Sequence, residues 1–290
     1  MTRQPPDLFS KRSATKEFLF SSPDEIAAES SAATVGPNGC DNGDDPLSTR
    51  FPDMLDPTGL NLTIDSSMDS VAQLCVVVIR IHSAPRQAST PDGNKLQTGD
   101  FADILEPVID VFRQHGDIWA RIGRCRFAFA IPHSSGTDGQ KLARQMQHVL
   151  PADGMTTLTA GVAYYPTVND TRSQIVGNAE KALVHAGFFG PGSVTEFDAV
   201  SLNISGDRLY QAGDIQGAID EFKKGLRIDP SDANLLNSLG VCYGVLEDYT
   251  NALTAFETAI WLAPEEVMPV YNRGFVFLCQ GDTEQALDCF

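Results

Sequence analysis

The chain has 290 residues, of which 42% are hydrophobic and 20% are charged, and its formal net charge is −17. This composition is ordinary for a globular protein of about two domains. No stretch approaches the roughly 18 apolar residues that a membrane-spanning helix needs, and an acidic surface repels nucleic-acid backbones and anionic membranes. We therefore expect a cytoplasmic protein that binds neither nucleic acid nor membranes.

The six cysteines form no C-x-x-C pair and lack the spacing with histidine that is typical of a metal site. They lie far apart or within apolar patterns, at Cys40, Cys75, Cys125, Cys242, Cys279 and Cys289. We expect buried free thiols, and we assign no metal or other cofactor to the chain.

Residues 1–55 are rich in Ser, Pro, Asp, Gly and Asn and lack a periodic apolar pattern. This composition predicts a disordered N-terminal arm. Its short apolar cluster at residues 18–20 is either a docking peptide for a partner or a chance apolar patch.

The next segment shows both helical and strand patterns. A Pro and a Gly predict a turn over residues 56–61. The β-branched run at residues 74–81 is typical of a central strand. Apolar residues at helical spacing then predict a helix over residues 101–112, which Pro107 either kinks or starts.

A hairpin is predicted over residues 121–132. Gly123 opens a tight turn, and residues 127–131 form a continuous apolar run, which is typical of a strand buried on both faces. Pro132 ends this strand. The periodicities that follow predict a helix at 138–150, a strand at 156–165 and a helix at 171–187.

This hairpin resembles the signature hairpin of the GGDEF family, the diguanylate cyclases, in which Arg-x-Gly-Gly-Asp/Glu-Glu-Phe precedes a hydrophobic strand. The matching residues are Arg121-Ile122-Gly123-Arg124-Cys125-Arg126-Phe127. The two ends of the motif agree, while the second glycine and both acidic positions are replaced by Arg124, Cys125 and Arg126. Further similarity at structural positions extends over residues 56–197. It implies an α+β domain with a mostly antiparallel central sheet flanked by helices.

The resemblance also implies that catalysis is lost. In the family, an acidic residue of the central strand and one of the hairpin hold magnesium ions, and the corresponding residues here are Arg80 and Arg126. Mg²⁺ takes oxygen ligands, and a guanidinium about 4 Å from a dication is repelled by several kcal/mol. We therefore expect no catalytic residue, no bound metal and no diguanylate cyclase activity.

Two acidic residues remain at positions that contact nucleotide in the family. Asp100 corresponds to the Asp that contacts guanine, although it is also explained as an acid favoured by the dipole of the following helix. Asp117 corresponds to the Asp of the Arg-x-x-Asp product-inhibition site, whose Arg is replaced here by Gln114. Asp100 and Asp117 are therefore the candidate nucleotide-binding residues.

From residue 199 onward the chain repeats with a period of 34 residues. This interval separates glycines, phenylalanines and prolines at Gly206, Gly240 and Gly274, at Phe222, Phe256 and Phe290, and at Pro230 and Pro264. The pattern resembles the tetratricopeptide repeat, a helix pair that stacks into a solenoid. Residues 199–290 thus hold two complete repeats and an incomplete third. We expect either a longer array or an apolar edge that another chain, such as a second copy, covers.

In such arrays the first helix of each repeat lines a groove that binds partners. The corresponding residues are Asn203, Asp207, Tyr210, Gln211, Asn234, Asn237, Tyr271 and Phe275. The paired Lys and Arg that would grip a C-terminal carboxylate are absent, and residues 199–290 contain 5 basic and 14 acidic residues. We expect a groove for a basic or polar peptide segment. The alternative is that these residues form ordinary solvated helix faces.

Together these patterns predict a disordered arm (1–55), an α+β domain (56–198) and an all-α solenoid (199–290). The function that we expect is that of a non-catalytic regulatory or scaffold protein, which recruits a protein partner through its repeats. One alternative is a domain that senses GTP or cyclic di-GMP without turning it over. Another is an active diguanylate cyclase, which requires that the alignment of the hairpin is wrong.

Overall fold

The computed structural model describes residues 46–66, 71–83, 98–152, 154–167 and 170–290. These residues form two compact units, one that ends at Ser201 and one that runs from Leu202 to Phe290. The predicted docking cluster at residues 18–20 lies outside the described residues.

The first unit is built around a five-stranded sheet with the strand order β2-β3-β1-β4-β5. Neighbouring strands are antiparallel except β4 and β5, which are parallel. The strands are β1 (Leu74–Ser83), β2 (Ile118–Gly123), β3 (Arg126–Pro132), β4 (Thr156–Tyr165) and β5 (Val194–Glu196). The expected α+β fold with a mostly antiparallel sheet is therefore confirmed for this unit.

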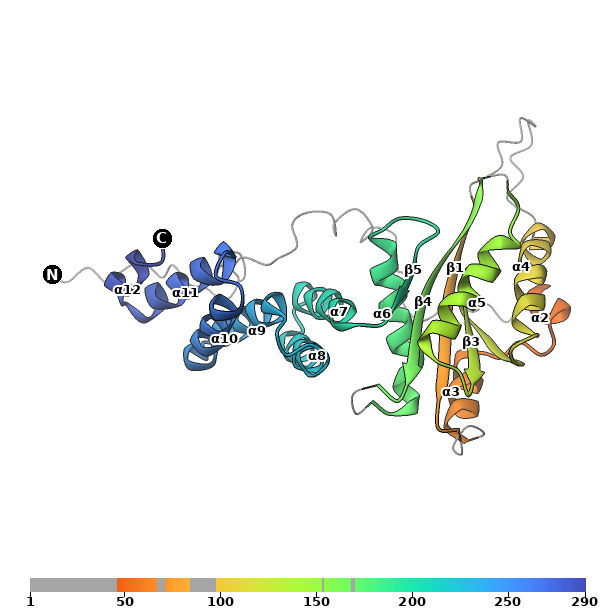
Figure 1. The fold of residues 1–290 in the computed structure, drawn as a ribbon, viewed down its shortest axis with the longest axis horizontal. Coiled ribbons are helices and arrows are strands. Elements are labelled where there is room, and N and C mark those ends of the chain that lie inside the picture. The colour runs from red at the N-terminus through yellow and green to blue at the C-terminus, as the bar shows by residue number, and fades with distance from the viewer. Residues whose placement is uncertain (1–45, 67–70, 84–97, 153, 168–169) are drawn as a thin grey trace. The chain divides into compact units, whose positions relative to one another are not determined.

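Helices cover both faces of this sheet: α4 and α5 lie on one face and α6 on the other (Figure 1). The helices of the unit are α2 (Pro46–Arg50), α3 (Pro57–Ser66), α4 (Thr98–Phe112), α5 (Gly136–His148) and α6 (Ile175–Gly187), with a short 3₁₀ helix, η3 (Arg172–Gln174), before α6. Pro107 lies inside α4, so it does not mark the start of this helix.

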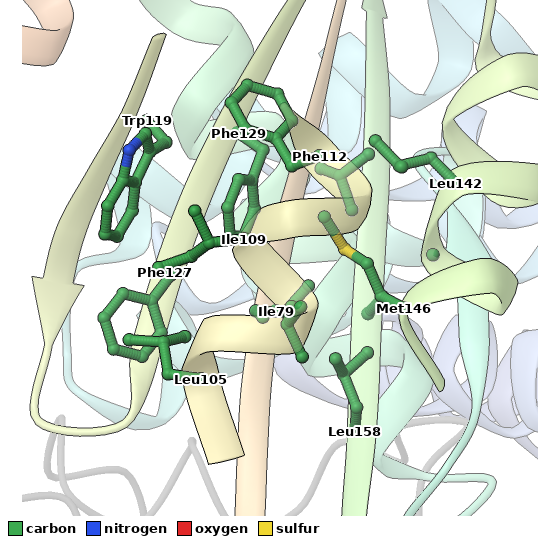
Figure 2. Packing of buried hydrophobic residues seen from close by; sticks show 14 of the residues in the cluster. Ile79, Leu105, Ile109, Phe112, Trp119, Phe127, Phe129, Leu142, Met146 and Leu158 are labelled. Atoms are coloured by element: carbon green, nitrogen blue, oxygen red, sulfur yellow. The ribbon is translucent and has the colours of Figure 1, made fainter. Parts of the chain in front are cut away.

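The main hydrophobic core lies between the sheet and helices α4 and α5 (Figure 2). Phe112 of α4 packs against Phe129 of β3 with ring centroids 4.9 Å apart, and Trp119 of β2 stacks on Phe129 at 6.0 Å. Leu142 and Met146 of α5 complete this cluster. The apolar residues predicted on two helices and two strands thus meet in one core.

The predicted hairpin is confirmed. Strands β2 and β3 are joined by a turn at Arg124 and Cys125. The apolar run of β3 is buried from Phe127 to Ile131, as expected for a strand covered on both faces.

Helix α6 lies very close to the opposite face of the sheet. Gly161 of β4 faces this helix, and a Cβ atom added to it would collide with the backbone of Ala179 and Leu183. Glycine is therefore required here, because it allows the close approach of two backbones.

Residues 46–55 contradict part of the predicted disordered arm. They contain α2, and both Leu47 and Phe51 belong to the core with 2% of their surface exposed. Leu55 then forms a parallel bridge with Ala120 on the edge strand β2. The predicted end of the arm at residue 55 is therefore wrong. A five-residue helix and a single bridge are too short to give a periodic pattern in the sequence.

The turn predicted at residues 56–61 is also wrong, because this segment starts α3. Asp56 caps the helix by accepting a hydrogen bond of 2.6 Å from Gly59 N. Pro57 is the first helical residue, a position where proline is favoured because its missing N–H is not needed. The proline signal therefore marks the start of a helix.

The second unit is a row of helices, each packed against the next. Gly206 of α7 lies against the ring of Phe222 of α8, and Gly240 of α9 lies against Phe256 of α10 in the same way. The helix pairs predicted from the 34-residue period are therefore confirmed. The helices are α7 (Ala199–Gln211), α8 (Ile215–Ile228), α9 (Ala233–Val245), α10 (Tyr249–Leu262), α11 (Val267–Gln280) and α12 (Thr283–Leu287).

Several acidic residues of this unit cap its helices. Each accepts a hydrogen bond from a backbone N–H in the first turn of α8, α9, α10 or α12, and they are Asp214, Asp232, Asp248 and Asp282. Aspartate is favoured at this position because it satisfies a free N–H group. Part of the acidity of residues 199–290 is thus explained by helix capping.

Candidate functional site

The first helices of the three repeats, α7, α9 and α11, contain all the residues that were predicted to line a groove. Four of them are exposed or half-buried: Asn203, Gln211, Asn234 and Tyr271. The other four are buried: Asp207, Tyr210, Asn237 and Phe275. These four expose at most 8% of their surface, so they add little to an open groove surface, and their part in binding a partner stays a prediction.

A buried amide pair links the first helices of the second and third repeats. Asn272 Nδ2 of α11 donates a hydrogen bond of 2.9 Å to Asn237 Oδ1 of α9, and both side chains are buried. Buried polar groups are normally paired in this way. Sequence reasoning missed Asn272, which lies one repeat and one residue after Asn237.

The residues one repeat earlier are Asn203 of α7 and Ser238 of α9. Asn203 Oδ1 and Ser238 Oγ are buried, and neither has a hydrogen-bond partner in the part of the chain that the structure describes. Asp207 Oδ1, one helical turn beyond Asn203, is also buried without such a partner. Sequence reasoning missed Ser238. Ser238 lies 34 residues before Asn272, and this spacing could have identified it once Asn272 was known to take part in the contact.

Burial changes the acidity of Asp207 and of two nearby groups. The side chain of Asp207 is only 4% exposed, and burial raises the pKa of its carboxyl group to about 7. Burial, with a smaller effect from the charge of Asp207, raises the pKa of the Cys242 thiol to about 12. Because a charge acts noticeably only over a short distance, Cys242 of α9 lies near Asp207. Burial also raises the pKa of Tyr210.

The hairpin of the first unit carries positive charge on one face of the sheet. Arg80 of β1 and Arg126 of β3 are directly opposite each other in the antiparallel register, so their side chains share a face. Arg126 Nη1 donates to Glu180 Oε1 of α6 at 3.0 Å, which identifies that face as the one covered by α6. Arg124 is exposed in the turn.

The two candidate nucleotide-binding acids are not joined to this arginine pair by any described contact. Asp117 is exposed just before β2 and makes no described hydrogen bond or ion pair. Asp100 lies in the first turn of α4, and its side chain lies outside the described part of the chain.

Two kinds of feature are absent from the described residues. Among them, no group of three or more His, Cys, Asp or Glu side chains is arranged to hold a metal ion. None of the described helices combines the length and apolar character that crossing a membrane requires.

Comparison with known proteins identifies the repeat. The family model of the TPR repeat matches residues 206–244. A curated relative, the BBSome complex member BBS4 homolog of Drosophila melanogaster, is 21% identical over 131 residues, which are 45% of this chain and 25% of that protein. The match thus spans about a quarter of the length of that relative.

Solved structures, some of them of TPR domains, are similar to about a third of the chain. The second TPR of Spaghetti (RPAP3) bound to an HSP90 peptide is 22% identical and covers 32% of this chain and 86% of that chain, with a TM-score of 0.31. MamA is 22% identical and covers 32% of this chain and 54% of that chain, also at 0.31. The resemblance of residues 56–197 to the GGDEF family stays a prediction from the sequence. The second unit carries a TPR repeat at residues 206–244, a kind of module that presents extended surfaces for binding other proteins.

Proposed function

We propose that this chain is a non-catalytic adaptor whose repeats, residues 199–290, bind a basic or polar peptide segment of a partner protein. The observation that carries this proposal is the TPR repeat at residues 206–244. Its helix pairs are packed through Gly206 against Phe222 and through Gly240 against Phe256. In this proposal the GGDEF-like unit is a platform or dimer module without cyclase activity.

Charge supports a basic rather than an acidic segment. Residues 199–290 contain 5 basic and 14 acidic residues. Even after the four capping aspartates are set aside, acids outnumber bases by two to one. Such a surface attracts cationic peptides and speeds their association at low salt.

The test measures binding of the full chain to an array of immobilised 12-residue peptides of varied charge. The variant Gln211→Lys/Asn234→Lys places two cations on exposed positions of the first helices. The matched control Gln216→Lys/Thr254→Lys adds the same charge to exposed positions of α8 and α10. We expect the first variant to weaken the binding of basic peptides and the control to leave most of it. Equal weakening by both, or no bound peptide at all, would count against the proposal.

A second function is favoured by one observation, the arginine pair at the hairpin. Arg80 and Arg126 lie opposite each other, and guanidinium groups bind phosphate oxygens without a metal ion. We propose as the alternative that the first unit senses GTP or cyclic di-GMP without turnover. Calorimetric titration with each nucleotide, with and without Mg²⁺, separates the functions: metal-independent binding supports the sensor, metal-dependent binding an active cyclase, and no binding the platform.

The cytoplasmic location and self-association of the chain stay predictions from the sequence. Sedimentation of the purified protein over a range of concentrations tests the second of them directly.

A further inference from the structure

We propose that Asn203, Asp207 and Ser238 form an acceptor site for one Lys or Arg side chain of the peptide that the repeats bind. This inference rests on the proposed peptide-binding function of the repeats. It adds which chemical group is recognised and which atoms recognise it.

The first evidence is a set of polar atoms without partners. Asn203 Oδ1, Asp207 Oδ1 and Ser238 Oγ are each buried and make no hydrogen bond within the described residues. Asp207 is 4% exposed and Ser238 is 0% exposed. A buried acceptor that lacks a donor is costly, and such groups are rare in folded proteins. Three of them on neighbouring helices indicate that a donor is supplied from elsewhere.

The internal repeat places these atoms together. Asn237 and Asn272 join α9 to α11 by a hydrogen bond of 2.9 Å. Subtracting 34 from their numbers gives Asn203 and Ser238, which occupy the same positions at the contact between α7 and α9. Between Asn203 Oδ1 and Ser238 Oγ, however, the structure shows no hydrogen bond.

Asp207 extends the same contact by one helical turn. It follows Asn203 by four residues, so the two side chains share a face of α7. Cys242 follows Ser238 by four residues on α9, and the charge of Asp207 acts on its thiol. The three free acceptors therefore lie along one stretch of the contact between α7 and α9.

The other repeats show that a carboxylate is not required for packing at this position. The residues 34 and 68 positions after Asp207 are Val241 and Phe275, and both are buried and apolar. An aspartate at the same position gives up that apolar contact and buries a carboxyl group. Burial is the single influence on the pKa of Asp207. It follows that no described cation lies close enough to offset the cost of burying its carboxyl group.

The chemistry of the three acceptors selects a cationic donor. The amide oxygen of Asn203 and the carboxylate of Asp207 accept hydrogen bonds, and a Ser hydroxyl can accept as well. Lys and Arg side chains carry several donors and no acceptor, and charge assistance strengthens their bonds to a carboxylate. Asn203 is half-buried and Gln211, one turn beyond Asp207, is exposed, so the buried acceptors border an accessible part of α7.

The experiment uses the full chain and an array of 12-residue peptides in matched triplets. Members of a triplet differ at one central position, which is Lys, Arg or norleucine. We expect the Lys or Arg member to bind about tenfold more tightly than the norleucine member, as for a charge-assisted hydrogen bond. The ratio should fall to about one in Asp207→Asn and in Asp207→Val, which copies the residue of the second repeat and so preserves the packing.

The matched control is Asp220→Asn, which removes the same charge from an exposed position on α8 and should keep the tenfold ratio. If wild type binds no triplet, the proposed function fails and the acceptor site fails with it. If triplets bind but wild type shows no preference for Lys or Arg, or the preference survives both Asp207 variants, the acceptor site alone is overturned.

Discussion

Arg80 of β1 lies directly opposite Arg126 of β3, and Arg126 is bonded at 3.0 Å to Glu180 of α6. Two guanidinium groups thus share one face of the sheet with a single described carboxylate as counter-charge. Side chains of like charge directly opposite each other destabilise a sheet. The positive charge of the pair also disfavours a bound divalent cation on this part of the sheet.

The first prediction is that the purified chain makes no cyclic di-GMP from GTP in the presence of Mg²⁺. If the resemblance to the GGDEF family holds, Arg80 and Arg126 stand where that family has metal-binding acids, and a magnesium ion would be repelled there. Chromatography of the reaction mixture after long incubation measures the product. Mg²⁺-dependent product above a no-enzyme control would overturn both this prediction and the non-catalytic function.

The second prediction concerns the packing of the repeats. A Cβ atom at Gly240 would lie 2.6 Å from Cε1 of Phe256, so Gly240→Leu should lower the free energy of unfolding by about 1–3 kcal/mol or more. Denaturant unfolding followed by circular dichroism measures the loss. The control is Gly177→Ala in α6, where an added Cβ meets open space and stability should stay the same or rise by up to about 1 kcal/mol. Equal stability of Gly240→Leu and wild type would show that this helix crossing tolerates bulk.

Long periodic patterns allowed the sequence to predict most of the fold. The 34-residue period requires only that equivalent residues recur, so the helix pairs were predicted from the sequence, whereas the contacts of Gly206 and Gly240 with phenylalanine rings were found in the structure. The hairpin was predicted because its turn and its buried strand are both local signals. Short elements were missed for the opposite reason, since α2 and the bridge at Leu55 depend on contacts with distant parts of the chain.

The candidate site was only partly predictable. The positions of Asn203, Asp207 and Asn237 on the first helices followed from the repeat. Their burial did not, because it depends on how neighbouring helices approach one another. The contrast between the bonded pair at Asn237 and the unbonded atoms at Asn203 needs side-chain geometry. No property of a linear sequence reports a hydrogen bond that is absent.

The third prediction concerns the start of α7. Asp198 Oδ1 accepts hydrogen bonds of 2.8 Å from Ser201 N and from Ser201 Oγ, and His185 Nδ1 lies 3.3 Å away. Burial alone would raise the pKa of Asp198, but the hydrogen bonds from His185 and Ser201 outweigh it and hold the pKa below its ordinary value. Because the folded-state pKa is lowered, this contribution to stability is present at neutral pH and is lost as the pH falls below about 4.

Asp198→Ala should therefore cost about 1 kcal/mol at pH 7, as expected for the loss of a helix cap. The difference from wild type should shrink at pH 3. Denaturant unfolding of both proteins at pH 7 and pH 3 measures this difference in the free energy of unfolding. A difference that is unchanged at pH 3 would mean that the side chain acts through packing and not through its charged hydrogen bonds.

The last prediction concerns Asp207 and the pH dependence of stability. Burial raises the pKa of its carboxyl group from 3.8 to about 7, so the folded state retains a proton that the unfolded state releases between these pH values. Stability must then fall as the pH rises from about 4 to about 7, by at most about 1.4 kcal/mol per pH unit for this one group.

The variant Asp207→Asn cannot ionise and removes this dependence. It should unfold at nearly the same temperature as wild type at pH 4.5 and at a higher temperature at pH 8, as measured by circular dichroism on the full chain. Cys242 and Tyr210, the titratable neighbours, stay protonated over this range because burial raises the pKa of both. Asp220→Asn, at an exposed position, should not change the difference between the two pH values. If Asp207→Asn is no more stable than wild type at pH 8, the ionised carboxylate of Asp207 does not destabilise the folded chain, which would contradict both the raised pKa and an unpartnered acceptor at this position.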